Sequence, residues 1–427
     1  MIRRNITTPL LDALADNPVV LLHGARQTGK STLVQWLASE GHPARYLTLD
    51  DAGVLAAVRE DPSGFLAAVE GPIVLDEVQR APGLFLAIKT AVDRDRRAGR
   101  FLLTGSANVM QLPRLSESLV GRMEVLTLWP MSQGEIEAVK EDFIDVVFSD
   151  VLWSKIKIRE KMSGLVGRML RGGYPAVLSR TSEARQKAWF GSYITTILQR
   201  DVRDLANIEG LTQLPRLLTL LAARAASLLN FSELSRSIAF PQTTLKRYLA
   251  LLESTFMVQT LPAWSGNLGK RLVKAPRLIL NDTGLLAYLL GLSRERLADN
   301  TTLVGPLLQN FVVMELRKQV PWSRTQAQLF HFRTQTGHEV DLLLEDAAGR
   351  LVGVEIKASA TINSRDFKGL RALAEATGRR FHRGVVLYTG AETIPFGERF
   401  HALPVSVLWS GKRTQPSSRN KTRSSIR

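Results

Sequence analysis

One eight-residue segment near the start of the chain has the residue types and spacing to hold the phosphates of a nucleotide. Residues 24–31 read Gly-Ala-Arg-Gln-Thr-Gly-Lys-Ser and fit the template G-x-x-x-x-G-K-[ST]. The glycines let backbone N–H groups converge on the phosphates, and Lys30 reaches the β- and γ-phosphates. The Ser31 hydroxyl is a ligand for Mg²⁺. The segment therefore predicts a site for ATP with Mg²⁺.

The context of this segment matches what the template requires, because a predicted strand precedes it and a predicted helix follows it. Arg26 has two interpretations, a phosphate contact or a solvated loop residue. The residues expected to line the nucleotide site are Gly24, Ala25, Arg26, Gln27, Thr28, Gly29, Lys30, Ser31 and Thr32.

Polar residues at the ends of two later predicted strands suit hydrolysis of the bound nucleotide. Asp76 and Glu77 end one strand, where Asp76 would hold the magnesium shell and Glu77 would polarise the attacking water. A helix cap is the alternative for such an acidic pair. The next strand ends at Thr104-Gly-Ser-Ala-Asn, which would bring the hydroxyl of Thr104 or Ser106, or the amide of Asn108, beside the γ-phosphate as a sensor. A simple turn is the alternative there.

Arg122 is the candidate arginine finger, a cation that stabilises charge on the transferred phosphoryl group. An ordinary surface arginine is the alternative. If Arg122 acts on a neighbouring copy of the chain, hydrolysis requires at least a homodimer.

Short β-rich runs that alternate with helical patterns indicate an α/β domain over residues 1–131. The runs are apolar on both faces, which is typical of a parallel sheet between two layers of helices. They are Val19–His23, Tyr46–Leu49, Ile73–Asp76, Phe101–Thr104 and Val125–Leu128.

The middle of the chain is predicted to hold a helical region, 132–228, and a winged-helix domain, 229–300. Two helices, at 231–238 and from 241 onward, have the spacing of a helix-turn-helix, and β-rich runs at 257–261 and 271–280 would supply the wing. Lys246 and Arg247 on the second helix would then be DNA contacts, with a packing module as the alternative.

Residues 301–410 are predicted to form a third, α/β unit with a second acidic site. Glu339 and Asp341 are two residues apart on one strand, and Glu355 and Lys357 are two apart on the next, so each pair points to one face. With Glu315 from the preceding helix, this face would gather three carboxylates and a lysine. A solvated strand face with incidental ion pairs is the alternative.

These patterns together resemble the AAA-type ATPases, specifically a bacterial and archaeal family that pairs this domain with a C-terminal domain of unknown function. Beyond the nucleotide motifs, the resemblance rests on YITTILQRDVR (193–203), TLKRYLALLE (244–253), KRLVKAP (270–276), NDTGL (281–285) and GPLLQNFV (305–312). It implies an ATP-binding domain, a winged helix and a nuclease-like fold.

The order of helix, hairpin, acid and Glu-x-Lys in the C-terminal unit resembles the PD-(D/E)XK nuclease core. In that core two carboxylates hold Mg²⁺ and the lysine positions or activates water for attack on a phosphodiester. Gln309 stands where relatives often have Glu, which leaves Glu315 as the helix carboxylate.

Composition limits the other function classes. The chain of 427 residues has no cysteine and six scattered histidines, so oxygen ligands must hold any metal. The net charge is +16, and about +10 without the basic residues 411–427, which are expected to be disordered. This charge favours DNA as a partner. No signal peptide or membrane span is expected, which predicts a cytoplasmic protein.

Three hypotheses about function are consistent with these sequence features. The first is a DNA-associated ATPase that couples nucleotide state to movement of the other domains. The second is a slow nucleotide switch that recruits a protein partner, and the third is a DNA nuclease regulated by ATP.

Overall fold

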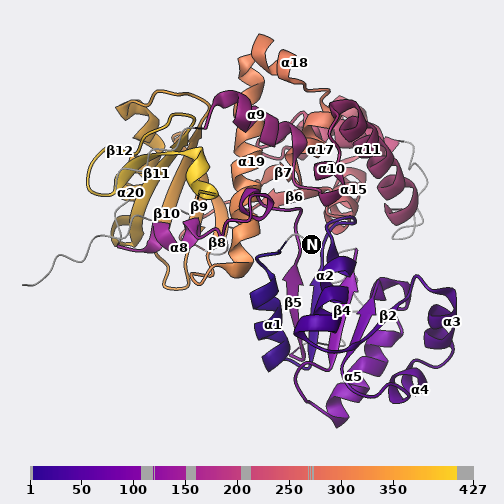
Figure 1. Ribbon diagram of the computed structural model, residues 1–427. Coiled ribbons are helices and arrows are strands. Elements are labelled where there is room, and N and C mark those ends of the chain that lie inside the picture. Colours follow the sequence, from indigo (N-terminus) through magenta and orange to yellow (C-terminus); the bar gives the residue numbers. More distant parts are fainter. Residues whose placement is uncertain are drawn as a thin grey trace, which may run out of the picture.

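The computed structural model describes residues 3–106, 119, 121–150, 160–202, 213–267, 269, 271 and 274–410, without the side chains of residues 200 and 201. The described chain forms three packed parts (Figure 1). A parallel sheet with its helices makes the first, a mostly helical middle the second, and a mixed sheet the third.

The first sheet has five parallel strands in the spatial order β2-β3-β4-β1-β5. All five were predicted from the sequence, with ends shifted by at most two residues. Their bounds are Val19–His23 (β1), Arg45–Thr48 (β2), Ile73–Asp76 (β3), Phe101–Gly105 (β4) and Met123–Thr127 (β5).

Helices cover both faces of this sheet because its strands are apolar on both faces. Along β1, Val20 and Leu22 pack into one hydrophobic cluster, and Val19 and Leu21 pack into the other. The first cluster includes α1 (Thr7–Asp16) and α2 (Lys30–Trp36, extended by a π-helical turn at Leu37–Gly41). The second includes α3 (Ala52–Glu60), α4 (Pro62–Ala67) and α5 (Leu84–Arg94).

The middle of the chain begins with a series of helices. They are α7 (Gln133–Ile136), α8 (Phe143–Phe148), α9 (Met162–Arg171), α10 (Pro175–Leu178), α11 (Glu183–Thr196, followed by a π-helical turn at Ile197–Asp201) and α13 (Leu214–Ala222). Helix α8 lies against the C-terminal sheet, where the ring of Phe148 stacks on His382 at a centroid distance of 6.0 Å. The helical pattern expected for this region is thus present in its described residues.

A helix pair and a hairpin follow, in the predicted order. They are α14 (Phe231–Ile238), α15 (Gln242–Ser254), β6 (Val258–Leu261) and β7 (Arg277–Leu280), and the two strands are antiparallel. The second strand begins at Arg277 rather than at Arg271. Two further helices, α17 (Thr283–Leu289) and α18 (Arg294–Asp299), complete the middle. The elements fit a winged helix, and that assignment stays a prediction.

The C-terminal part is a six-stranded mixed sheet in the order β12-β13-β11-β10-β9-β8. Strands β8, β9 and β10 are antiparallel neighbours, and α20 joins β10 to β11, which runs parallel to it. The bounds are Gln328–Arg333 (β8), Glu339–Glu345 (β9), Leu351–Lys357 (β10), Lys368–Thr377 (α20), Phe381–Tyr388 (β11), Ile394–Pro395 (β12) and Phe400–Pro404 (β13). The three strands predicted here, β8 to β10, are confirmed.

Helix α19 (Val304–Gln319) runs between the three parts, and twelve of its sixteen residues are buried. Its buried polar side chains form hydrogen bonds; for example, Asn310 Oδ1 accepts from Leu280 N at 2.8 Å. Short 3₁₀ helices lie at Val78–Arg80, Thr301–Leu303, Val320–Trp322, Ser364–Phe367, Gly378–Arg380 and Val405–Leu408. Within the described ranges, no helix has both the length and the apolar composition needed to cross a bilayer.

Candidate functional site

The glycine-rich loop connects the carboxyl end of β1 to the start of α2. Gly24 has a φ of +152°, and a Cβ there would lie 2.2 Å from the carbonyl oxygen of Leu128, so only glycine fits. Gly29 has a φ of +93° and forms the N-cap of α2. Ser31 and Thr32 therefore lie in the first turn of the helix, at the end that favours anions.

Lys30 is buried, with its ammonium group over the loop. The Nζ atom donates to the carbonyl oxygens of Gly24 and Ala25, each at 2.9 Å. Thr28 Oγ1 also donates to the Ala25 carbonyl, at 2.9 Å. The lysine predicted to meet the phosphates is thus held at the centre of the loop by weak, neutral acceptors, which a phosphate can replace.

Asp76 ends β3 at the same edge of the sheet, because the strands are parallel. Its side chain is only 3% exposed, and it accepts hydrogen bonds from Tyr46 at 2.7 Å and from Thr104. Burial, followed by the bond to Asp76, raises the pKa of Tyr46 to about 12. Both donors are neutral hydroxyls, and in the described part of the chain no cation forms an ion pair with this carboxylate. This oxygen chemistry fits a magnesium ligand.

Glu77 follows in a left-handed backbone conformation, with a φ of +61°. A non-glycine residue rarely adopts this conformation, and such strain is concentrated at functional sites. Its N–H donates to Thr104 Oγ1 at 3.1 Å, and its carboxylate accepts from Ser106 Oγ at 2.9 Å and from Gln79. The structure therefore brings both predicted sensor hydroxyls to the acidic pair. Asn108 lies outside the described residues.

Arg122 lies at the opposite edge of the sheet from the loop. It immediately precedes β5, and its Nε donates to Asp93 of α5 at 2.7 Å. This bond lowers the pKa of the Asp93 carboxyl. Because the loop follows the carboxyl ends of the strands, Arg122 is separated from its own nucleotide site by the length of β5. A role as an arginine finger therefore requires a second copy of the chain.

The base of the loop packs against the middle of the chain. The ring of Phe256, between α15 and β6, meets the ring of His23 edge-on at 5.2 Å and that of Trp129 at 5.8 Å. Burial, followed by the charge of Lys30, lowers the pKa of His23 to about 4. Ala25 belongs to the same hydrophobic cluster as Phe256. The P-loop is therefore in direct contact with the helix-and-hairpin region, which consists of α14, α15, β6 and β7. A change in the conformation of the loop would act on this region through these contacts.

A second connection from the loop runs through Arg4. This buried arginine donates to the carbonyl oxygens of Thr28 at 2.7 Å and Trp129 at 2.8 Å, and its Nε donates to Glu135 at 3.0 Å. Glu135 occupies the N3 position of a capping box whose N-cap residue is Ser132. The loop is thereby tied to the segment that leaves β5.

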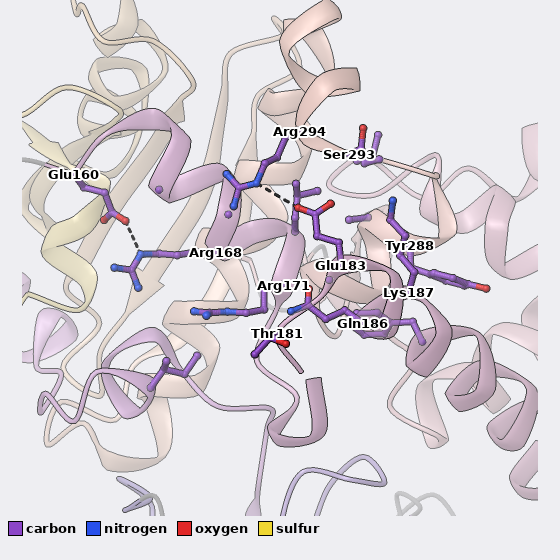
Figure 2. A pocket seen from close by; sticks show the side chains of 18 of the residues that line it. Glu160, Arg168, Arg171, Thr181, Glu183, Gln186, Lys187, Tyr288, Ser293 and Arg294 are labelled. Atoms are coloured by element: carbon purple, nitrogen blue, oxygen red, sulfur yellow. Dashed lines mark hydrogen bonds and ion pairs between the residues drawn. The ribbon is translucent and has the colours of Figure 1, made fainter. Parts of the chain in front are cut away.

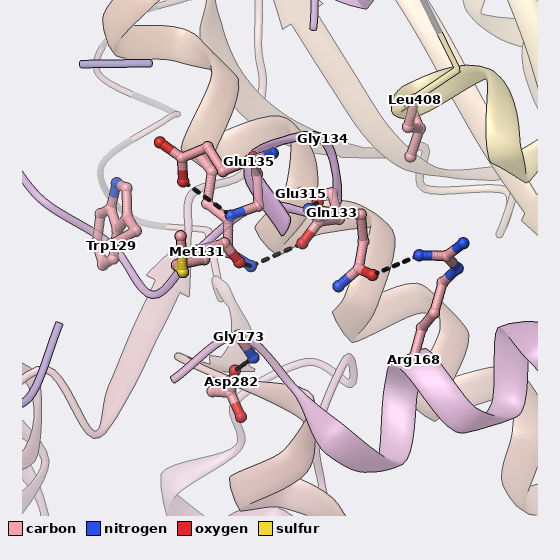
Figure 3. A network of polar contacts seen from close by, with 12 residues as sticks. Trp129, Met131, Gln133, Gly134, Glu135, Arg168, Gly173, Asp282, Glu315 and Leu408 are labelled. Atoms are coloured by element: carbon pink, nitrogen blue, oxygen red, sulfur yellow. Dashed lines mark hydrogen bonds and ion pairs between the residues drawn. The ribbon is translucent and has the colours of Figure 1, made fainter. Parts of the chain in front are cut away.

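That segment is in turn bonded to helix α19 (Figure 3). The N–H of Gln133 donates to Glu315 at 2.8 Å, and Lys318 donates to Glu315 at 2.6 Å and to the Met131 carbonyl at 3.0 Å. Nearby, burial, followed by the charge of Glu315, raises the pKa of Glu141 well above its ordinary value.

Two sequence motifs interlock beside this segment, RGGYP at 171–175 and the NDTGL motif noted above. In the first, the carbonyl oxygen of Gly173 accepts from Met131 N at 2.8 Å, and the Gly173 N–H donates to Asp282 of the NDTGL motif at 2.7 Å. A Cβ on Gly173 would lie 2.2 Å from the Met131 carbonyl oxygen. Asp282 also caps α17 by accepting from Leu285 N. The motifs thus hold the middle of the chain against the segment that follows the parallel sheet.

The C-terminal acidic face is occupied by an arginine. Arg277, 6% exposed, comes from β7 and donates to Asp341 at 2.9 Å and to Glu339 at 2.6 Å. On the next strand Lys357 donates to Glu355 at 2.9 Å. Burial, followed by the charge of Asp341, raises the pKa of Glu355 to about 7.

The predicted role of Glu315 at this face is wrong. Its oxygens accept from Gln133 and Lys318, on the other side of α19, whereas Gln309 is the helix residue that reaches Asp341, at 3.2 Å. Six residues turn an α-helix through about 600°, so Gln309 and Glu315 face different directions. In the described part of the chain, no group of three His, Asp or Glu side chains is arranged to hold a metal ion.

Sequence reasoning missed several residues that contact the two sites. Gln79 lies two residues after Glu77, a spacing that could have drawn attention to it. For the others no local pattern exists, since their partners are distant in sequence. They are Arg4, Tyr46, Phe256 and Arg277.

Three family models match the chain. Residues 16–137 match the AAA domain, residues 162–296 match a domain of unknown function (DUF8612), and residues 304–408 match another domain of unknown function (DUF4143). The AAA match includes the glycine-rich loop and the acidic pair of β3, and it identifies a P-loop ATPase domain.

Proteins of two mycobacteria are similar over nearly the whole length. They are the uncharacterised proteins Rv2008c of Mycobacterium tuberculosis and Mb2031c of Mycobacterium bovis. Each is 33% identical over 409 residues, which is 95% of this chain and 84% of the mycobacterial protein.

Two solved structures are similar at lower identity. The Walker-type ATPase PABY2304 of Pyrococcus abyssi is 15% identical, with 68% of this chain and 96% of that chain covered and a TM-score of 0.42. A variant of RuvB from Thermotoga maritima is 18% identical, with 60% and 87% covered and a TM-score of 0.28. At these scores neither likeness supports an argument about function.

Proposed function

Because the chain belongs to the family of the two mycobacterial proteins and carries an AAA domain, we propose that it is a Mg²⁺-dependent ATPase whose nucleotide state controls association with DNA. The observation that carries the coupling is the contact between the base of the P-loop and Phe256 of the helix-and-hairpin region. Hydrolysis at the loop would then change the position of the region that is proposed to meet DNA.

In the proposed mechanism Lys30 exchanges its two carbonyl partners for the β- and γ-phosphates. Ser31 and Asp76 would hold Mg²⁺, which neutralises charge on the phosphates. Glu77 orients and polarises the attacking water once its carboxylate leaves Ser106 and Gln79. Thr104 keeps its bonds to both acidic residues and so holds their relative position. Arg122 acts on the site of a neighbouring copy.

The proposed DNA contact is the exposed face of α15. Lys246 and Arg247 are both exposed, and the Lys246 ammonium lies 5.6 Å from the centre of the Phe231 ring. The net charge of the whole chain is also positive, so it too favours binding to a negatively charged phosphate backbone.

The first experiment is phosphate release from Mg-ATP with and without duplex DNA at fixed salt, with Glu77→Gln as the blank. Stimulation by DNA should disappear in Lys246→Ala/Arg247→Ala. It should persist in Arg365→Ala/Lys368→Ala, which removes the same charge from exposed positions of the C-terminal part. Loss of stimulation in both double variants would contradict a specific contact at α15.

A slow switch that recruits a protein partner is the second candidate function. The bonds that favour it are those from Arg4 to the P-loop and to Glu135, because they connect the nucleotide site to α19 without involving α15. Slow turnover that is indifferent to DNA would support the switch over the DNA-coupled ATPase.

Nuclease activity is a third candidate, and it has one structural requirement. Arg277 would have to leave Asp341 before that carboxylate could hold a metal ion. Nicking that is lost in both Asp341→Ala and Lys357→Ala would support this function, and cleavage that survives both changes would exclude it.

A further inference from the structure

A cavity of about 550 Å³ lies among the helices of the middle part, and no residue of the P-loop or of the two acidic sites lines it. Its walls come from α9, α11, α17 and the start of α18, and α7 closes one side (Figure 2). This volume is in the range of sites for small molecules. Most of the lining falls within the domain of unknown function at residues 162–296.

The lining is rich in charge, with an excess of cations. Four cationic side chains, Arg168, Arg171, Lys187 and Arg294, face three glutamates. Arg168 is fully engaged, because it bonds Glu160 at 2.5 Å, a second glutamate and Gln133. Arg294 is paired as well, with a glutamate at 3.4 Å and the Ser163 carbonyl at 2.9 Å.

Arg171 and Lys187 take no part in these ion pairs, although the charge of Glu137 acts on Arg171 and the charge of Lys187 acts on Glu295. Among the described residues, neither forms an ion pair with an acidic side chain, and the buried Nε of Arg171 has no hydrogen-bond partner. Arg171 is the last residue of α9, and Figure 2 shows its guanidinium group among the polar side chains of the cavity. A buried donor without a partner is destabilising unless a ligand or water satisfies it.

We propose that this cavity binds a small phosphorylated molecule, with Arg171 as the anchor of the phosphate and Lys187 as a second cation at the rim. Two cations that are not held in ion pairs suit the double negative charge of a phosphate monoester better than a single carboxylate does. The cavity is larger than a phosphate ion. The ring of Tyr288 lines the remaining space and offers a flat surface to an organic group.

The cavity is also in contact with the segment that joins the parallel sheet to α19. Ile136 of α7 and the following Glu137 line it, and Arg168 Nη1 donates to Gln133 Oε1 at 3.1 Å. The same Gln133 is bonded to Glu315 through its N–H. A ligand in the cavity would therefore change ATP turnover, a consequence that rests on the proposed function, whereas binding itself does not.

Binding is tested on the full chain with Lys30→Ala, so that the P-loop does not dominate the signal. The probes are AMP, inorganic pyrophosphate and acetate, measured by isothermal titration calorimetry. AMP and pyrophosphate should bind saturably, and acetate, a single carboxylate, should bind weakly. Arg171→Gln should weaken AMP binding by about tenfold or more, the loss expected for a charged hydrogen bond.

Two further variants separate binding from folding. Arg185→Gln removes a cation from an exposed position of α11 that does not line the cavity, and it should leave AMP affinity unchanged. Arg171→Lys should recover part of the affinity, because the charge is kept and the fork of donors is lost.

The proposal is overturned if no probe gives saturable heat up to about 10 mM, a concentration that would reveal even weak sites. It is also overturned if Arg171→Gln binds AMP as tightly as its parent. Equal loss of affinity in Arg171→Gln and Arg185→Gln would contradict a specific anchor.

Discussion

Two acidic groups belong to strands of two different sheets, one at the end of β3 and one within β9 and β10, and their surroundings are opposite in character. Asp76 and Glu77 accept hydrogen bonds only from neutral hydroxyl and amide donors among their described contacts. Asp341 and Glu355 are instead bonded to cations, Arg277 and Lys357. The first group therefore has no cationic partner among its described contacts, and the second group is paired with cations of the chain.

The difference shows why carboxylate spacing alone is a weak indicator of a metal site. Both groups consist of closely spaced acids on buried strands, and only the partners distinguish them. A buried carboxylate needs a countercharge. At β3 the natural candidate is Mg²⁺ on a nucleotide, whereas at β9 it is Arg277.

The largest expected effect comes from Glu77→Gln. The change preserves shape and removes the base, so ATP hydrolysis should fall by about 10²- to 10³-fold while ATP still binds. Phosphate release under saturating Mg-ATP measures it, and Asp341→Asn serves as the matched change at the other acidic group. A comparable loss of rate in Asp341→Asn would remove the distinction between the two groups.

The next effect is on stability, in Arg277→Gln. Loss of the arginine leaves Asp341 and Glu339 without their countercharge, so the free energy of unfolding should fall by about 3 kcal/mol. Urea denaturation measures the loss, and adding Asp341→Asn should recover part of it. Mn²⁺ should raise the melting temperature of Arg277→Gln more than that of the parent chain. If Arg277→Gln is as stable as its parent, the acidic face does not depend on this cation.

A smaller effect on stability involves two buried histidines, His23 near Lys30 of the P-loop and His331 near Arg277. The pKa of His23 and that of His331 are both lowered to about 4, by burial first and then by Lys30 and Arg277, respectively. In the unfolded chain each titrates near 6.5, so below that pH the unfolded state binds more protons. The free energy of unfolding should therefore fall as the pH drops from 6.5 toward 4, by about 1–2 kcal/mol per histidine at pH 5.

The test compares urea denaturation at pH 7 and pH 5 for the parent chain and for His331→Gln, which can still donate to the Ala275 carbonyl. The variant should lose about 1–2 kcal/mol less than the parent between the two pH values. The pKa of Glu355, raised to about 7, acts in the opposite sense between pH 4.5 and 7, and it contributes to both proteins. An identical pH dependence in parent and variant would show that His331 is not buried in its neutral form.

The smallest effects should come from single neutral donors. Tyr46→Phe removes the 2.7 Å bond to Asp76, and Gln309→Leu removes the 3.2 Å bond to Asp341. Each should reduce the free energy of unfolding by about 1 kcal/mol, and Tyr46→Phe should also weaken Mg-ATP binding several-fold. If Gln309→Leu altered nucleotide binding as much as Tyr46→Phe, the two acidic groups would not be independent.

The parallel sheet and its loop were predictable because their evidence is local. Apolar runs such as Val19–His23 are short and bounded by clear breaks, and the loop follows the first of them. The local pattern is misleading at α19. A helix that is buried on most sides carries no amphipathic pattern to show which residue faces the sheet, so the sequence does not indicate that Gln309 rather than Glu315 lies there.

The sequence by itself determined the P-loop, the strands of the parallel sheet, strands β8 to β10 of the C-terminal sheet and the helix-and-hairpin order, since each depends on residues within a few positions of one another. Only the tertiary structure decided the partners of the charged groups. Arg277 and Asp341 are 64 residues apart, and Gln133 and Glu315 are 182 apart. Such pairs form because packing brings the elements together, and no local propensity encodes which cation will meet which carboxylate.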